Sequence, residues 1–254
     1  FIEPAATNLY VYSEDYTTSW TATRSSITAN ATTAPNGTLS ADALIEDVST
    51  NSHYVYQPVS VTAGTAYTYS IYVKINTRSA VAIQFYNTNG AFTAAAVYFD
   101  LLSGTIYSKD VAVLNASISN VGSGWYRISA TATALATVSG NIALHLASSP
   151  ATTTSYTGDG VSGVYIWGAQ LETGYSATSY IPTTSSTVTR AADVSTSAQS
   201  TRAADYAAIT GTNFSSWYRQ NEGTMYAEYK QPNVRAGTYP CVYAFRPIGE
   251  NGSQ

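Results

Sequence analysis

Residues 67–74 decide the fold, and they read Tyr67-Thr68-Tyr69-Ser70-Ile71-Tyr72-Val73-Lys74. Large apolar side chains fall at alternate positions from Tyr67 to Val73. Successive side chains of a β-strand point to opposite faces of a sheet, so this alternation predicts a strand with one face in the core. Tyr, Thr, Val and Ile are also residue types that favour strands.

The same two-residue period recurs through residues 8–182. Three further segments carry apolar sets at alternate positions: Val81, Ile83 and Phe85; Tyr126, Ile128, Ala130 and Ala132; Ile142, Leu144 and Leu146. Turn sequences separate the segments, among them Pro35-Asn36-Gly37, Asn89-Gly90, Gly122-Ser123-Gly124 and Gly158-Asp159-Gly160. This pattern predicts an all-β protein in which two antiparallel sheets pack face to face. One short helical segment is expected, over residues 40–45.

The composition narrows the class of protein. Of the 254 residues, 44% are apolar and only 10% are charged, against roughly 25% charged in an average globular domain. Ser, Thr and Asn supply the polarity, which is typical of secreted or virion-exposed β proteins. The net charge of −4 predicts no nucleic-acid partner. No apolar run approaches the ~20 residues of a membrane span, so we expect no membrane insertion. The lone Cys241 excludes an internal disulfide.

The chain divides into three parts by composition. Residues 1–182 carry the strand pattern. Residues 183–205 are rich in Thr, Ser and Ala, which predicts a linker, and they contain Thr189-Arg190-Ala191-Ala192-Asp193 repeated as Thr201-Arg202-Ala203-Ala204-Asp205. Residues 206–254 regain strand character but are too few for a sandwich of their own. We expect them to form a partial second β module or an assembly segment.

A family resemblance is carried by an ordered set of segments. They include Asn8-Leu9-Tyr10-Val11-Tyr12-Ser13-Glu14-Asp15 with Trp20, Ala34-Pro35-Asn36-Gly37-Thr38, His53-Tyr54-Val55, Gly124-Trp125-Tyr126-Arg127, Ile166-Trp167-Gly168-Ala169-Gln170-Leu171-Glu172 and Ser179-Tyr180-Ile181-Pro182-Thr183. In this order they resemble a module of bacteriophage tail-fibre, tail-spike and other virion proteins. They are also similar to the jelly-roll carbohydrate-binding modules of glycanases. The resemblance implies a jelly-roll sandwich, glycan adhesion and oligomeric assembly.

The segments after residue 205 carry a second resemblance. Asn213-Phe214-Ser215-Ser216-Trp217-Tyr218 followed by Glu222-Gly223-Thr224 looks like the opening of a concanavalin-like or laminin-G-like sandwich. The chain holds only the beginning of such a module, and strand edges left unpaired there would favour completion by other chains.

No sequence feature indicates catalysis. Both histidines, His53 and His145, sit inside strand patterns, and no Gly-x-Ser-x-Gly elbow occurs. Carboxylates that adjoin in sequence, as in Glu46-Asp47, face opposite ways on a strand. We therefore expect no enzymatic activity.

Glycan binding has the best support among binding functions. If the apolar sets face the core, the side chains at the intervening positions of each strand point to the outer faces. They are a mixture of aromatic rings and hydrogen-bonding groups, which is the combination that a polar ligand requires. The alternative is that these side chains cover a sheet or fill an oligomer interface, and they need not share one sheet. The candidate glycan-binding residues are Tyr72, Gln84, Tyr86, Trp125, Arg127 and His145.

A metal site is implied only by the resemblance. Modules of this type often carry a structural Ca²⁺ near their first and last strands, and calcium prefers carboxylate and carbonyl oxygens. The candidate ligands are Glu14, Asp15, Asp159 and Glu172. Trp167 stands near the position where such modules often place a metal-binding Asp. We expect no other cofactor.

Three functions remain open from the sequence. The favoured one is a non-catalytic protein of the virion surface or a tail fibre, extracellular and bound to host glycans. Its partners would be other virion chains, in a homotrimer because fibres of this kind usually have threefold symmetry. The alternatives are a carbohydrate-binding module of a secreted glycanase, which predicts a monomer, and a structural capsid-decoration or fibre-spacer protein.

Overall fold

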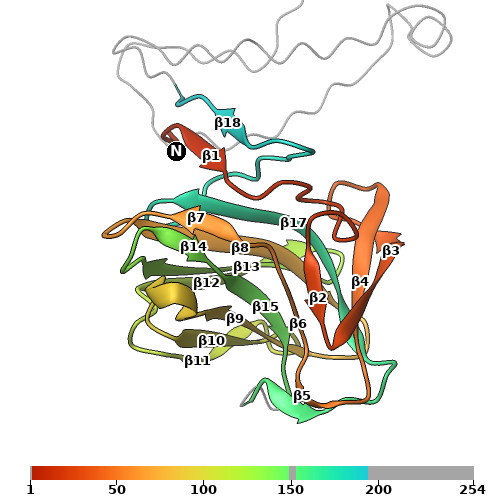
Figure 1. The fold of residues 1–254 in the computed structure, drawn as a ribbon. Coiled ribbons are helices and arrows are strands. Elements are labelled where there is room, and N and C mark those ends of the chain that lie inside the picture. The colour runs from red at the N-terminus through yellow and green to blue at the C-terminus, as the bar shows by residue number, and fades with distance from the viewer. Residues whose placement is uncertain (1, 149–152, 194–254) are drawn as a thin grey trace, which may run out of the picture. The chain divides into compact units, whose positions relative to one another are not determined.

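The computed structural model describes residues 2–148 and 153–193 (Figure 1). All of them belong to the first of two units into which the chain divides, Phe1–Gln199 and Ser200–Gln254. The partial second module expected over residues 206–254 lies outside the described residues, as does Cys241.

The described residues form an antiparallel β-sandwich of two six-stranded sheets, as the alternating pattern predicts. Sheet I has the strand order β11-β10-β9-β15-β6-β2 and sheet II the order β12-β13-β8-β17-β4-β3. The chain passes repeatedly from one sheet to the other, for example from β4 to β6 to β8, and this crossing is consistent with a jelly roll (Figure 1).

The strand bounds are as follows. Sheet I contains β2 (Thr21–Thr23), β6 (Tyr54–Tyr56), β9 (Ala80–Phe85), β10 (Ala95–Asp100), β11 (Thr105–Lys109) and β15 (Ile142–Leu146). Sheet II contains β3 (Ser25–Thr33), β4 (Leu39–Glu46), β8 (Ala66–Ile75), β12 (Asn115–Gly122), β13 (Trp125–Thr133) and β17 (Gly163–Thr173). Three small pairs join β1 (Ala6–Asn8) to β18 (Val188–Arg190), β7 (Val59–Val61) to β14 (Val138–Gly140), and β5 (Thr50–Ser52) to β16 (Ser155–Thr157).

The core lies between the two sheets and is built from the predicted apolar sets. On β8, Tyr69, Ile71 and Val73 are fully buried, while Tyr72 and Lys74 face the other way and are half-buried. The alternating apolar residues of β9 and β15 are likewise fully buried. The aromatic residues of the N-terminal segment close one end of this core, with the Trp20 ring 4.9 Å from both Tyr10 and Tyr16.

The helix expected over residues 40–45 is wrong. These residues belong to strand β4, which pairs with β3 on one side and with β17 on the other. Ala and Leu favour helices by propensity alone, but pairing with two neighbouring strands overrides that weak preference. The described residues contain no α-helix; their one helical turn is a 3-10 turn at Thr88–Gly90.

The expected linker does not begin at residue 183. Thr183 is buried, and β18 pairs antiparallel with β1, which places Arg190 opposite Ala6. The Arg190 guanidinium also forms an ion pair with Glu3. The sandwich unit therefore includes residues 183–190, and the later part of the expected linker lies outside the described residues.

A membrane-spanning helix was not expected, and the described part of the chain contains no helix long and apolar enough to be one.

Candidate functional site

The six predicted glycan-binding residues separate onto two faces. Gln84, Tyr86 and His145 belong to the outer face of sheet I. Tyr72, Trp125 and Arg127 belong to the outer face of sheet II, where Arg127 of β13 lies opposite Tyr72 of β8. The structure therefore places three of them on each outer face, and they do not form one site.

The outer face of sheet I has small side chains in its middle and aromatic rings at both sides. In one cross-strand row, Ala82 lies between Tyr98 of β10 and His145 of β15, and His145 lies opposite Tyr54 of β6. In the next row, only Ala143 separates Gln84 from Tyr56. Both alanines are fully buried although they point away from the core, so larger neighbours must cover them.

Three half-buried tyrosines, Tyr54, Tyr56 and Tyr86, form what we call the tyrosine platform. The Tyr54 ring centroid lies 5.9 Å from that of Tyr56 and 6.0 Å from that of Tyr86, and the rings are tilted by similar angles. Together with Thr88 and Asn141 they line a hollow of about 140 Å³. Rings beside hydroxyl and amide groups are the combination that a polar, ring-shaped ligand requires.

His145 supports the platform from below. Its imidazole stacks on Tyr54 with centroids 4.6 Å apart, and its Nε2 lies 2.8 Å from the Tyr86 hydroxyl. Burial, helped by the positive charge of Arg24, lowers the pKa of His145 to about 3. The ring is therefore neutral at pH 7. Because it is fully buried, His145 positions the tyrosines and is not itself exposed to a ligand.

Tyr54 is held on more than one side, and this leaves Tyr56 as the freest ring. The Arg24 guanidinium lies 5.7 Å from the centre of the Tyr54 ring, in addition to the stacked imidazole. Tyr56 contacts no other ring than Tyr54 among the described residues. Tyr86 is held through its hydroxyl by His145, so the geometry leaves Tyr56 as the least constrained ring of the platform.

Sequence reasoning missed Tyr54 and Tyr56. Their signal is the triplet Tyr54-Val55-Tyr56, in which a buried Val55 sends both tyrosines to the outer face. The triplet is too short to stand out by periodicity alone. Its importance comes from its pairing with β15, which puts Tyr54 beside His145.

On sheet II, a chain segment covers the predicted residues Tyr72 and Arg127. Residues 174–184 follow β17, and Arg127 donates to the Thr178 carbonyl at 2.7 Å and to the Ser70 hydroxyl at 2.9 Å. The Tyr72 ring packs edge-on against Trp167 and Tyr180. Both side chains are therefore occupied in holding this segment to the sheet.

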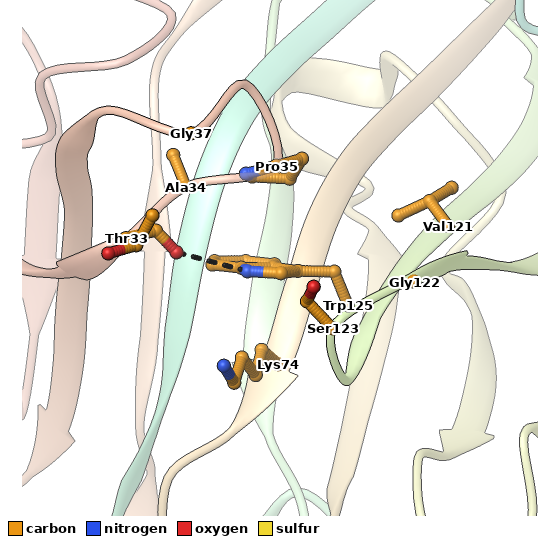
Figure 2. Close-up of a pocket in the computed structure, with 9 residues that line it drawn as sticks. All are labelled: Thr33, Ala34, Pro35, Gly37, Lys74, Val121, Gly122, Ser123 and Trp125. Carbon is orange, nitrogen blue, oxygen red and sulfur yellow. Dashed lines mark hydrogen bonds between the residues drawn. The ribbon is translucent and has the colours of Figure 1, made fainter.

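Trp125 lies at the base of a separate hollow on sheet II, shown in Figure 2. Only 1% of Trp125 is exposed, and its indole Nε1 donates to the Thr33 carbonyl at 3.2 Å. The hollow measures about 230 Å³, and its walls are the turn around Pro35 and the turn at residues 121–123. The sequence predicts Trp125 as a glycan-binding residue on the outer face, but an indole buried to this degree cannot act as an open stacking surface.

The four carboxylates proposed for calcium do not form a site. In residues 2–148 and 153–193, no three His, Cys, Asp or Glu side chains gather as metal ligands. Asp15 and Asp159 accept hydrogen bonds within their own turns, from Thr17 and Ser162. The hydrogen bond from the Ser162 hydroxyl lowers the pKa of Asp159. Glu172 accepts from Gln170 and Thr178, and Glu14 from the Tyr180 hydroxyl.

A buried amide on the first strand makes hydrogen bonds to β17 and to the segment after it. Asn8, fully buried on β1, donates to the carbonyls of Ala169 and Ile181 and accepts from the backbone N–H groups of Tyr10 and Leu171. These bonds join the first strand to β17.

Comparisons with known proteins add three structural neighbours. No family model matches the chain, and no curated protein matches it. Among solved structures, the enzymatically active domain of tailspike protein 4 from bacteriophage CBA120 is similar over 66% of this chain and 21% of its own, with 13% identity and a TM-score of 0.41.

Two carbohydrate-binding proteins are also similar. The module TmCBM61, solved with β-1,4-galactotriose, matches 65% of this chain and 97% of its own at 12% identity, with a TM-score of 0.38. The CBM22-1–GH10 part of xylanase 10B from Clostridium thermocellum, solved with xylohexaose, matches 71% of this chain and 30% of its own at 19% identity, with a TM-score of 0.36. The chain thus spans about a fifth of the tailspike domain and nearly all of the isolated module.

Proposed function

We propose that this protein is a non-catalytic glycan-binding module that holds a neutral saccharide on the tyrosine platform of sheet I. The observation that carries the proposal is the grouping of three half-exposed tyrosine rings around one hollow with Thr88 and Asn141. Aromatic rings pack against the apolar faces of sugar rings, while hydroxyl and amide groups hydrogen-bond to sugar hydroxyls. All five lining residues are uncharged, which favours a neutral sugar.

The states of the two histidines support a role without catalysis. His145 is buried and neutral at pH 7 because of its low pKa. His53 is also buried, with its Nδ1 2.7 Å from the Arg24 carbonyl. A general base must reach a substrate proton, and both imidazoles are enclosed by neighbouring groups.

The wider role that we propose is attachment of a virion or tail fibre to host glycans, outside the cell and as a homotrimer. The charge-poor, hydroxyl-rich composition supports exposure outside the cell. The alternative role, a carbohydrate-binding module that serves a glycanase, would use the same tyrosine platform of this chain, and the oligomeric state separates the two roles.

The platform is tested by binding of the purified chain to an array of neutral and acidic oligosaccharides. Tyr56→Ala and Tyr86→Ala should each reduce binding of the preferred glycan by about tenfold or more, since each removes a stacking ring. Tyr175→Ala is the matched control, because Tyr175 is 69% exposed on the segment after β17.

Two results would contradict the proposal. One is the absence of binding to any saccharide by a folded chain. The other is a preferred glycan whose affinity is unchanged in both platform variants.

A further inference from the structure

The hollow around Trp125 contains a cation without a partner. Lys74 is half-buried and lines this hollow together with Pro35, Val121 and Ser123. Figure 2 shows Lys74 and Pro35 on opposite sides of the Trp125 indole. No hydrogen bond, ion pair or cation–π contact involves its ammonium group among the described residues. The residues that line the hollow include no Asp or Glu.

Every other lysine and arginine in the described part of the chain has a hydrogen-bond or ion-pair partner for its charged group. Arg78 pairs with Glu46 and Arg190 with Glu3. The remaining cations donate to backbone carbonyls, namely Arg24 to Ser52, Lys109 to Val113 and Arg127 to Thr178. A positive charge in a concave, partly desolvated place with no counter-charge is attractive to an anion, because screening by water is reduced there.

The walls of the hollow are fixed before any ligand binds. In the turn after β3, the Ala34 N–H donates to the Thr38 carbonyl and the Gly37 N–H to the Ala34 carbonyl. In the turn after β12, Ser123 and Gly124 have φ angles of 51° and 78°, as a tight two-residue hairpin requires. Between these turns the Trp125 indole is anchored to Thr33. A ligand would therefore lose little binding energy in ordering the protein.

We propose that this hollow binds a carboxylate-bearing sugar residue, such as a hexuronic acid, with the carboxylate against the Lys74 ammonium. The ammonium offers three donors and a compact charge. Pro35 and Val121 supply apolar surface for one side of the sugar ring, and Ser123 supplies a hydroxyl group.

The size of the hollow agrees with this choice. At about 230 Å³ it lies below the ~300–1,000 Å³ of pockets for drug-sized ligands, so it accommodates one sugar ring or the end of a chain. A free anion such as acetate would use Lys74 but none of the walls. The site is independent of the tyrosine platform, because it lies on sheet II and takes a charged sugar.

The test is an NMR titration of the unmodified, ¹⁵N-labelled chain at constant ionic strength. The reporters are the Trp125 indole N–H and the backbone N–H groups of Ser123 and Gly124. Glucuronate should shift these signals in a saturable manner, glucose should leave them unchanged, and acetate should bind about tenfold more weakly. N-acetylglutamate is the fourth ligand, and represents an acidic peptide.

Variants then identify the charge that is responsible. Lys74→Gln should weaken glucuronate binding about tenfold or more, and Val121→Glu, at an exposed position, should weaken it by like-charge repulsion. Lys109→Gln is the control, because Lys109 is the other lysine of the described residues and bonds the Val113 carbonyl. Tyr56→Ala should leave glucuronate binding unchanged, which separates this site from the proposed platform.

Several outcomes would overturn the inference. Equal affinity for acetate and glucuronate would indicate an adventitious anion only. Equal or stronger affinity for N-acetylglutamate would indicate an acidic peptide. Absence of any shift, or full binding by a folded Lys74→Gln variant, would remove the site altogether.

Discussion

The side-chain amide of Asn8 uses its full hydrogen-bonding capacity inside the sandwich. It donates to two carbonyls at 2.9 and 3.0 Å and accepts from two backbone N–H groups at 3.1 Å. Asn8→Asp replaces both N–H donors by an oxygen, so two buried carbonyls would face a carboxylate. We expect a loss of about 2–5 kcal/mol in the free energy of unfolding, measured by urea denaturation at pH 7.

Asn36→Asp is the matched control for this variant. Asn36 is exposed and uses only its side-chain oxygen, which accepts from the N–H and hydroxyl of Thr38. A carboxylate retains that function, so stability should change by less than about 0.5 kcal/mol. Equal effects of the two substitutions would show that the bonds of Asn8 do not hold β1 to the sandwich.

His145 makes stability depend on pH in a predictable direction. Its pKa is about 3 in the folded protein, below the ordinary value of 6.5. The unfolded chain therefore takes up the proton first as the pH falls. The stabilisation is complete above pH 6.5 and is lost between pH 6.5 and 3, with a slope from this group of about 1.4 kcal/mol per pH unit.

Two measurements check this prediction. In an NMR titration, the imidazole signals of His145 should show no protonation between pH 8 and about pH 5. In urea denaturation, the stability of His145→Gln should fall less steeply below pH 6.5 than that of the unchanged chain. A His145 signal that titrates near its ordinary pKa would contradict the buried, neutral state.

At the scale of elements, the hairpin between β12 and β13 contains a residue that does not suit its backbone. Gly122 pairs with Trp125 around the central residues Ser123 and Gly124, both with positive φ. Asn tolerates this conformation better than Ser, and Asn-Gly is a preferred pair for such turns. Ser123→Asn should stabilise the protein by about 0.5 kcal/mol and raise Tm by roughly 1–2 °C.

The control for the turn is Ser119→Asn, on the exposed side of β12. This position lies within a strand, where Asn is less favourable than in a turn, so no gain in Tm is expected. Thermal denaturation followed by circular dichroism measures both variants. A lower Tm for Ser123→Asn would mean that the turn does not need the left-handed preference of Asn.

Elements could be predicted from the sequence wherever one face of a strand is buried. Large apolar side chains alternate along β8, β9 and β15, and the sandwich predicted from this pattern is confirmed, although outward-facing residues such as Ala143 and His145 are buried as well. Strand β4 lacks this alternation, because Ala41, Ala43 and Ile45 fall on one face and Leu44 on the other. Its sequence therefore shows no two-residue period and resembles a helix.

At the scale of the whole molecule, alternation along a strand predicts whether a side chain points toward the core or away from it. It predicts neither which sheet the strand joins nor which distant segment covers an outward-facing side chain. Tyr72 and Tyr86 both point away from the core, yet they belong to opposite sheets. The exposure of Trp125 depends on the turn near Pro35, and that of Arg127 on the segment at Thr178. These contacts bring together segments that are distant in the sequence, so the local residue pattern of a strand cannot predict them.

The oligomeric state separates the proposed virion role from a glycanase-associated one. Strand β11 lies at the edge of sheet I, and large apolar residues near it are exposed, including Val111 at 98% and Leu114 at 50%. An open strand edge beside apolar side chains is suited to contact between chains.

We expect a trimer by light scattering of the full chain. Val111→Glu combined with Leu114→Glu should shift the mass toward that of a monomer, and Val161→Glu, at a position 71% exposed, should not. A monomeric unchanged chain would contradict the trimer and favour the glycanase-associated module. A trimer that resists the double substitution would keep the virion role but move the interface away from β11.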